Sequence, residues 1–393
     1  MNLTCPATAA DYRELARARL PRFLFDYVDG GAGDEHTLAA NVADWARVRL
    51  RQRVLVDVGQ VDTSTRLAGE PCQMPVVLAP VGLAGLMGRR GEVQAVRAAN
   101  AAGIPFTLST VGICPLEEVQ AAATAPVWFQ LYMIRQRPLV LSLLQKAWAA
   151  GCRTLVFTVD LPQPGMRHRD TRNGLAATGP RAALLKAQQL LARPHWLWDV
   201  AVRGRPHHFG SLGDAVPAAR DLDAFKTWVD AQFDPTVTWA DIEWLRGHWR
   251  GRLLLKGIMD VDDARAAVLV GADGIIVSNH GGRQLDGVAS TASSLPSIVA
   301  AVGAQTEVLV DGGVRSGTDI FRALALGAHG VLVGRPWVWA LAAGGEQGIR
   351  DLLASWQQEL RLAMTLTGVT RIADIGSAQL DLCAPASTAI RPD

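Results

Sequence analysis

Residues 278–287, SNHGGRQLDG, combine a histidine and an arginine at a spacing that suits chemistry on an anion. His280 ends an apolar run, two glycines follow it, and Arg283 stands three residues further on. An imidazole can remove a proton near neutral pH, and a guanidinium binds a carboxylate through two parallel hydrogen bonds. Most single histidines are surface or structural residues, but the pattern around His280 favours a general base that acts on an anionic substrate.

Two further charged residues end or interrupt apolar runs that are typical of buried strands. Asp160 closes TLVFTVD, where it could hold an imidazole in the correct tautomer or simply cap the strand. Lys256 follows three leucines, and a buried ammonium is unfavourable unless an anion offsets its desolvation. The residue types leave two roles open for Lys256, a Schiff base or the neutralisation of a cofactor anion.

Glycines and arginines mark a candidate phosphate site nearer the C-terminus. In VDGGVRSGTDIF the glycines precede Arg315 and a helix start, and in VGRPWVW Gly334 and Arg335 precede a second helix. Glycines let backbone N–H groups approach an anion, a helix N-terminus adds a favourable dipole, and the arginines supply charge. Ordinary glycine turns beside surface arginines are the alternative, and the sequence favours a phosphate-bearing ligand.

Eight short apolar runs, separated by helical segments rich in alanine and leucine, supply the scaffold that these residues need. Near-continuous apolar strands are buried on both faces, which predicts an α/β fold with a closed (β/α)8 TIM barrel. A doubly wound open sheet is the alternative, but no GxGxxG follows the first run. The runs are residues 76–80, 105–110, 127–132, 154–160, 252–258, 274–280, 307–313 and 330–335.

Polar residues gather at the ends of these runs, and the active sites of barrels lie at the C-terminal ends of the strands. An acid, a base, an ammonium and several hydrogen-bond donors are therefore expected at one mouth. They are Ser109, Thr110, Gln130, Tyr132, Thr158, Asp160, Lys256, Ser278, Asn279, His280, Asp311, Arg315, Gly334 and Arg335.

A long insertion, roughly residues 165–238, follows the fourth strand, and a crossover helix is expected over 239–249. We expect a single domain over residues 1–393, with the barrel strands between about 74 and 335. Insertions of this length in barrels often cover the catalytic face. The leucines, tryptophans (Trp196 and Trp198) and basic residues of the insertion suit contact with a membrane surface. A lid that packs its tryptophans on the barrel or on a neighbouring subunit is the alternative.

The composition excludes several classes of function. A net charge of +2 offers no electrostatic case for nucleic acid. The five cysteines lack CxxC spacing, which indicates reduced thiols, and no HExxH or carboxylate cluster predicts a metal site. The N-terminus has no apolar signal region, and the longest apolar run, residues 74–88, is too short to span a membrane. Any membrane contact is therefore expected to be peripheral.

With these residues in place, the chain resembles the FMN-dependent α-hydroxy acid dehydrogenase/oxidase family from about residue 12 to residue 368. The motifs that carry the resemblance are FLFDYVDGGAGDEHTL, LAPVGLAGLMGRRGE, WFQLYM, TVDLPQPGMRHRD, LLLKGI, SNHGGRQLDG and DGGVRSGTDIFRALALGAHGVLVGR. Within the family, residues 89–119 and 363–368 look most similar to bacterial respiratory L-lactate dehydrogenases. The resemblance implies an FMN cofactor at the phosphate site and oxidation of L-lactate to pyruvate, with electrons passed to a membrane quinone.

The resemblance also implies roles for individual residues. His280 would be the base and Asp160 its partner. Lys256 would lie against the N1/C2 carbonyl edge of the flavin and stabilise the reduced ring, which removes the Schiff-base role. The residues that would hold FMN are Pro80, Val81, Gly82, Ser109, Gln130, Thr158, Lys256, Ser278, Asp311, Gly312, Gly313, Arg315, Gly334 and Arg335.

Four residues would hold the substrate if the resemblance carries over by position. Arg167 and Arg283 would clamp its carboxylate. Tyr27 and Tyr132 would form hydrogen bonds to it, and the chain has only three tyrosines.

Two positions depart from the pattern of the plant oxidases in the family. Val111 stands where glycolate oxidase has a tryptophan, so the pocket wall differs. Gly82 stands where typical oxidases carry alanine, which favours an acceptor other than dioxygen. Mandelate as substrate, dioxygen as acceptor and a non-catalytic phosphate-binding scaffold remain as alternatives. Removal of the α-proton and removal of the hydroxyl proton with hydride transfer both fit the same residues.

The family resemblance bears on location and assembly as well. Membrane-associated members carry their lipid-facing segment in the insertion, which implies contact through residues 175–215 here. We therefore expect a peripheral protein on the cytoplasmic side of the inner membrane, with the cytoplasm as the alternative, and a homotetramer.

Overall fold

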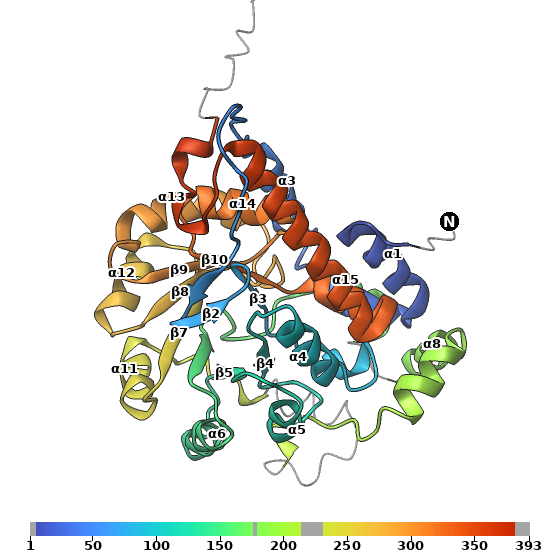
Figure 1. Ribbon diagram of the computed structural model, residues 1–393. Helices are drawn as coiled ribbons and strands as arrows, with labels where there is room; N and C mark the ends of the chain where they lie inside the picture. Colours follow the sequence, from blue (N-terminus) through green and yellow to red (C-terminus); the bar gives the residue numbers. More distant parts are fainter. Residues whose placement is uncertain (1–4, 176–178, 214–230, 382–393) are drawn as a thin grey trace, which may run out of the picture.

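The computed structural model describes residues 5–175, 179–213 and 231–381, and its eight parallel strands form one sheet ordered β3-β10-β9-β8-β7-β6-β5-β4. The sheet closes where Leu78 and Phe106 form a parallel bridge and the Leu78 N–H donates to the Pro105 carbonyl over 3.0 Å. The predicted (β/α)8 barrel is thus confirmed (Figure 1). The strands are β3 (Val76–Leu78), β4 (Thr107–Ser109), β5 (Trp128–Tyr132), β6 (Thr154–Thr158), β7 (Arg252–Ile258), β8 (Gly274–Val277), β9 (Glu307–Val310) and β10 (Gly330–Val333).

Most strands are shorter than the apolar runs that predicted them, because the polar residue at the end of a run belongs to the loop. The run 274–280 forms a strand only as far as Val277, and His280 follows in a left-handed conformation. Asp160, Asp311 and Arg335 also lie beyond the last residue of their strands. These polar residues therefore stand on the loops at the mouth, whereas Ser109, Gln130, Tyr132, Thr158 and Lys256 lie at or near the ends of the strands themselves.

Helices follow the strands and form the outer ring of the barrel (Figure 1). Ser316 begins one of them by accepting a hydrogen bond from the Asp319 N–H, and Asp260 begins another by accepting from the Asp262 N–H. The crossover helix expected over 239–249 is present as α11. The helices of the ring are α4 (Gly91–Ala101), α5 (Leu116–Ala121), α6 (Arg137–Ala149), α11 (Trp239–His248), α12 (Val261–Leu269), α13 (Thr291–Val302), α14 (Gly317–Ala325) and α15 (Arg335–Thr367).

A short hairpin, β1 (Thr65–Leu67) and β2 (Glu70–Cys72), covers the base of the barrel. Leu67, Ala68 and Cys72 of this hairpin pack against side chains that fill the barrel interior. The Glu70 carboxylate accepts from Trp128 Nε1 over 3.0 Å, and the Ala68 N–H donates to the Glu307 carboxylate over 2.9 Å. The base is therefore sealed by the chain's own apolar and hydrogen-bonding groups.

Three N-terminal helices lie beside the mouth: α1 (Ala9–Arg19), α2 (Arg22–Asp29) and α3 (His36–Arg47). α1 packs against α15. Trp45 of α3 donates its Nε1–H to the Gly312 carbonyl over 2.8 Å, which ties α3 to the loop after β9. Short 3-10 turns complete the described chain: η1 (Ala84–Leu86), η4 (Ile372–Asp374) and η5 (Ser377–Gln379).

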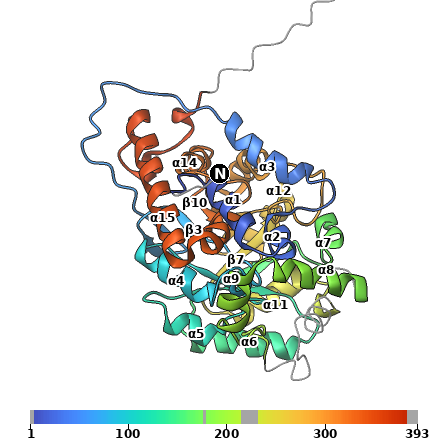
Figure 2. The same cartoon turned by 90° about the vertical axis from the view of Figure 1, so that its right-hand side faces the viewer.

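The insertion after β6 forms α7 (His168–Arg172), α8 (Pro180–Leu191), α9 (Pro194–Trp196) and the π-helical turn η2 (Leu197–Val202). α7 and α8 lie against α2 (Figure 2). The two tryptophans behave differently: Trp196 is buried and donates to the Leu86 carbonyl over 2.8 Å, whereas Trp198 is 63% exposed. Of the two tryptophans, only Trp196 therefore packs on the barrel, as the lid alternative expects, and Trp198 remains on the surface. Across the described ranges, no helix is long and apolar enough to cross a membrane.

Candidate active site

The polar residues reach the mouth because side chains alternate along each strand. Every second residue points into the barrel, and the outermost inward position lies at the mouth. An apolar residue that fills the interior is therefore followed two positions later by a polar one. The pairs are Trp128 and Gln130, Val156 and Thr158, Leu254 and Lys256, Ile276 and Ser278, and Leu309 and Asp311.

His280 and Asp160 form a hydrogen-bonded pair at the mouth. His280 Nδ1 lies 2.8 Å from Asp160 Oδ1, although 120 residues separate them in the sequence. Burial works to raise the pKa of Asp160, but the charges of His280 and Lys256 outweigh it, and the pKa lies below its usual value. An ionised Asp160 fixes the proton on Nδ1 and leaves Nε2 as the basic nitrogen.

The backbone of His280 is held in a strained conformation. Its φ is 56°, in the left-handed region, and Gly281 and Gly282 continue with φ of 64° and 72°. The His280 N–H donates to Ser278 Oγ over 3.1 Å. A β-carbon at Gly281 would lie 2.7 Å from Arg335 Nη1, so glycine lets the Arg335 guanidinium pack against this loop. Strained backbone of this kind persists where many surrounding contacts hold it in place, and it is typical of functional loops.

Lys256 is buried between two oxygen groups. Its Nζ lies 2.9 Å from Asp311 Oδ2 and 2.9 Å from Ser278 Oγ. Burial favours the neutral amine, but Asp311 and Asp160 outweigh it and raise the pKa of Lys256 above its usual value. Lys256 is therefore a permanent cation, which suits the stabilisation of a nearby anion and does not suit an amine nucleophile.

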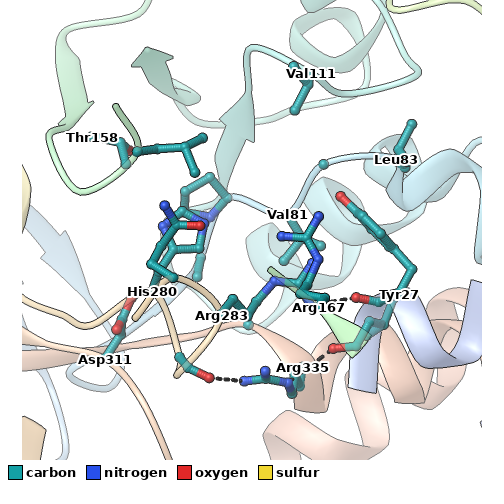
Figure 3. Close-up of a pocket in the computed structure, with 18 of the residues that line it drawn as sticks. Tyr27, Val81, Leu83, Val111, Thr158, Arg167, His280, Arg283, Asp311 and Arg335 are labelled. Atoms are coloured by element: carbon teal, nitrogen blue, oxygen red, sulfur yellow. Dashed lines mark hydrogen bonds between the residues drawn. The ribbon is translucent and has the colours of Figure 1, made fainter. Parts of the chain in front are cut away.

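Arg167, Arg283 and Tyr27 lie near His280 (Figure 3), and Tyr132 lines the same cavity. Arg283 donates to the Tyr27 and Gly30 carbonyls and lies over the Tyr27 ring, 5.0 Å from its centre. Burial and the charge of Arg167 lower the pKa of Arg283 to about 10, so it stays charged at neutral pH. Arg167 Nε pairs with Asp170 Oδ2 over 2.8 Å. The four residues predicted to hold the substrate thus line one cavity.

The two arginines of the predicted phosphate site lie at the same cavity. Arg335 donates to the Val28, Gly30 and Gly281 carbonyls, at 3.0, 2.9 and 2.8 Å. The guanidinium of Arg315 lies 5.1 Å from the centre of the Trp339 ring. Burial lowers the pKa of Arg315 to about 10 and that of Arg335 well below its usual value. Within the described chain neither guanidinium is paired with a carboxylate, which is the state of a site built for an anionic ligand.

A chain of hydrogen bonds backs one wall of the cavity. Ser109 Oγ donates to Gln130 Oε1 over 3.1 Å, and Gln130 Nε2 donates to Thr158 Oγ1 over 3.0 Å. Thr158 lines the cavity, whereas Ser109 and Gln130 stand directly behind it. Ser278 and Asp160 likewise support lining residues from behind. Thr110 and Asn279 are buried away from the cavity, where they form hydrogen bonds with Gln130 and Asn41. The other predicted site residues line the cavity themselves, including Pro80, Val81, Gly82, Gly312, Gly313 and Gly334.

Gly82 is needed because its neighbours leave no room for a side chain. A β-carbon there would lie 2.7 Å from Val111 Cγ2 and 3.2 Å from the Tyr27 hydroxyl. The Leu83 N–H donates to the Val111 carbonyl over 3.0 Å, which fixes the two loops against each other. The two positions that depart from the plant oxidase pattern are thus in direct contact.

The cavity has a volume of about 440 Å³ and includes apolar residues that the sequence did not single out. They come from α2, from the loop after β3, from the loop after β6 and from the insertion, so they are far apart in sequence. No local pattern marks them, because their proximity depends on how the insertion returns to the barrel. They are Phe23, Leu86, Leu161, Phe209 and Phe233.

Comparison with known proteins identifies the class. The family model described as FMN-dependent dehydrogenase matches residues 16–382. The protein belongs to this family, and its cofactor is FMN.

Individual relatives give finer comparisons. The chain is 54% identical to the L-lactate dehydrogenase of Caulobacter vibrioides and 52% identical to that of Alcaligenes faecalis. These alignments cover 95% of this chain and 97% and 98% of the relatives. Among solved structures, the monotopic membrane protein (S)-mandelate dehydrogenase superposes with a TM-score of 0.89 at 33% identity, over 95% of this chain and 99% of that one. Mandelate oxidase superposes with a TM-score of 0.79 at 40% identity, over 94% and 96%.

The residues at the cavity fit FMN. Arg315 and Arg335 offer two buried charges to a phosphate, beside the left-handed glycines Gly312 and Gly313. Asp311 Oδ1 is buried without a hydrogen-bond donor in the described residues, as suits an acceptor for the hydroxyl groups of a ribityl chain. Lys256 adds a fixed positive charge next to the apolar wall at Val81.

Proposed function

We propose that this FMN-dependent dehydrogenase oxidises L-lactate to pyruvate, with His280 as the base. The observation that carries the proposal is the His280–Asp160 pair, which turns a basic Nε2 toward the cavity that Arg167 and Arg283 also line. The names of the relatives at 52–54% identity support lactate as the substrate. We further propose that residues 1–393 fold as one domain.

In this proposal each substrate group meets a matching group of the protein. Arg283 and Arg167 bind the carboxylate, because two guanidinium groups offer parallel donors to its oxygens. The hydroxyl groups of Tyr27 and Tyr132 orient the substrate by hydrogen bonds. His280 Nε2 then accepts one proton from the substrate, and Asp160 stabilises the imidazolium that results.

Bound FMN supplies the acceptor for the two electrons that leave the substrate. Arg315, Arg335 and the backbone at Gly312 and Gly313 hold its phosphate end. The permanent charge of Lys256 stabilises negative charge that develops beside it. The groups proposed to hold the ring are Pro80, Val81, Gly82, Ser109, Gln130, Thr158 and Ser278; Asp311 and Gly334 complete the site.

Anaerobic mixing of the yellow protein with L-lactate, D-lactate, glycolate and mandelate tests the proposal. We expect L-lactate to bleach the flavin fastest and D-lactate to leave it oxidised. His280→Gln should remain yellow and lose the bleaching. Fast flavin reduction in that variant would rule out His280 as the base, and failure of every acid would rule out the activity.

Mandelate is the second candidate substrate, favoured by the fold similarity to (S)-mandelate dehydrogenase. The apolar residues of the cavity, Phe23, Leu86 and Leu161 among them, could accept a phenyl group. The ratio of kcat/KM for L-lactate and (S)-mandelate decides between the two.

We propose a membrane quinone as the electron acceptor and the cytoplasmic side of the inner membrane as the location. Exposed apolar residues of the insertion support a membrane contact: Leu184 and Leu191 lie two turns apart on one face of α8 and are 62% and 74% exposed. Trp198 is exposed close by. Arginines that accompany them, such as Arg181 and Arg203, suit an anionic lipid surface.

Sedimentation with vesicles that contain anionic lipid tests the membrane contact. Leu184→Asp/Leu191→Asp should leave the protein in the supernatant without loss of dye-linked activity. Leu55→Asp, a change at a fully exposed leucine outside the insertion, is the control and should still sediment. Activity with a soluble quinone analogue, compared with peroxide formation in an oxygen electrode, distinguishes a dehydrogenase from an oxidase. We also propose a homotetramer, which the mass in solution by light scattering tests.

A further inference from the structure

The last part of the insertion runs back along the segment that follows β5. Phe233 forms an antiparallel bridge with Ile134, and the Arg135 N–H donates to the Gln232 carbonyl over 3.0 Å. Arg135 Nε also donates to the Phe233 carbonyl, over 3.2 Å. These bonds fix the backbone at Phe233 relative to β5, the strand that carries Tyr132.

An ion pair fastens the same segment from the other side. Arg137 Nη2 lies 3.0 Å from Asp234 Oδ2 and 2.7 Å from Asp241 Oδ1. Asp234 is almost fully buried, with 8% of its side chain exposed. This ion pair and its link to the start of α11 hold the segment around Phe233 against the barrel.

The ring of Phe233 meets the ring of Tyr132 edge to face. The ring centres are 5.4 Å apart and the planes are inclined by 88°, which is the favoured geometry for an aromatic pair. Both rings line the cavity. Burial raises the pKa of Tyr132 far above its usual value, so its hydroxyl remains protonated and able to donate.

We infer that Phe233 is a positioning and specificity-determining residue: it holds the Tyr132 ring in one orientation and closes the apolar end of the cavity next to it. The inference rests on the proposed function, since Tyr132 matters only if a 2-hydroxy acid binds beside it. The phenyl ring fills volume that a larger substrate side chain needs. It therefore favours a methyl group on the substrate over a phenyl group.

Three substitutions separate the two effects. Phe233→Ala removes both the ring and its volume, Phe233→Leu keeps much of the volume without the aromatic pair, and Phe233→Tyr keeps both. We expect Phe233→Ala to raise KM for L-lactate about 10-fold, in line with the loss of one aromatic pair and its bulk, with a smaller change in kcat. The ratio of kcat/KM for mandelate over L-lactate should rise at least 10-fold in Phe233→Ala. It should change less in Phe233→Leu, and Phe233→Tyr should behave as the wild type.

A double-mutant cycle with Tyr132→Phe tests whether Phe233 acts through the Tyr132 hydroxyl. We expect the KM effect of Phe233→Ala to shrink by at least half in the Tyr132→Phe background. Additive effects, or an unchanged substrate ratio in Phe233→Ala with normal flavin content and melting temperature, would overturn the inference. The assays use whichever 2-hydroxy acid reduces the flavin in the wild type, so failure of lactate as a substrate does not decide the role of Phe233.

Discussion

The two ends of the barrel both bury charged side chains, but the base buries carboxylates that accept hydrogen bonds, whereas the mouth also buries arginines that lack a carboxylate partner. At the base, Glu70 accepts from Trp128 and Glu307 accepts from the Ala68 N–H. At the mouth, Arg315 and Arg335 are buried without a carboxylate partner in the described residues. A buried charge that the chain leaves uncompensated is unfavourable in the free protein and becomes favourable when an anion binds. Buried arginines without a carboxylate partner, more than burial itself, therefore distinguish the ligand site from the sealed end.

The largest expected effect is at the mouth, where the base depends on its carboxylate partner. Asp160→Asn should lower kcat by about 10² to 10⁴, the usual contribution of general acid–base catalysis, because the imidazole loses both its fixed tautomer and its counter-charge. Steady-state assays with L-lactate measure the loss. Glu70→Gln is the matched change at the base and should leave kcat unaltered. A loss of similar size in both variants would mean that the two ends do not differ in this way.

The second prediction concerns the unpaired arginines. Arg315→Met should weaken FMN binding by about 10- to 150-fold, the value of a hydrogen bond to a charged group. The melting temperature of the protein without cofactor should stay the same or rise, because a buried uncompensated charge has been removed. Fluorescence titration with FMN and thermal melts measure both quantities.

Arg252→Met provides the control for Arg315→Met. Arg252 lies near the base and already pairs with Asp273 over 2.9 Å, so its removal should leave FMN affinity unchanged. Equal losses of affinity in the two variants would contradict the distinction between paired and unpaired arginines.

A smaller effect is expected at the close contact between Gly82 and Val111 at the mouth. Gly82→Ala places a β-carbon against Val111, so kcat/KM should fall about 10-fold through overpacking worth 1–3 kcal/mol. Val111→Ala in the same protein should restore at least half of the loss, because it removes the methyl group that is struck. No recovery in the double variant would show that the contact with Val111 is not the cause.

The smallest effect is a difference in pH dependence between the two ends. Burial raises the pKa of Glu307 above its ordinary value of 4.5, so a loss of stability begins near pH 4.5 and grows until the pH passes the folded-state pKa. Glu307→Gln should therefore gain stability relative to the wild type between pH 4 and pH 7, by no more than about 1 kcal/mol.

The pH dependence of stability should have the opposite sign at Asp160. Its lowered pKa stabilises the fold above pH 3.8, and that contribution is lost as the pH falls through the folded-state value. The deficit of Asp160→Asn should be constant from pH 5 to pH 8 and shrink below pH 4. Melting temperatures across this range measure both variants, and parallel curves would refute the assignment of opposite signs.

The regular parts of the mouth could be predicted from the sequence. Alternation along the strands made Lys256 and Asp311 inward-facing, and the (β/α)8 pattern brought the strand ends of Asp160 and His280 together. Each of these inferences needed only the local pattern and the rule that parallel strands end on the same side.

Contacts that depend on long connections were beyond the sequence. Phe233 meets Tyr132 only because the insertion returns along the segment after β5. The sequence around either residue does not indicate that the two are in contact. Which of the two tryptophans, Trp196 or Trp198, is buried also depends on how the insertion folds over Leu86. The seal at the base also depends on long-range contacts, since Glu70 and Glu307 meet their donors Trp128 and Ala68 only across the fold.

The closure of the barrel has one further consequence. β3 and β4 are joined by a single bridge at Leu78 and Phe106, whereas other neighbouring strands share ladders of two to five residue pairs. Val81 and Gly82 follow one side of this joint, and Ser109 and Val111 follow the other. A cofactor that contacts both sides links β3 and β4, the two neighbouring strands that share the fewest backbone pairings. Amide hydrogen exchange at this joint should therefore report how tightly FMN is held, residue by residue.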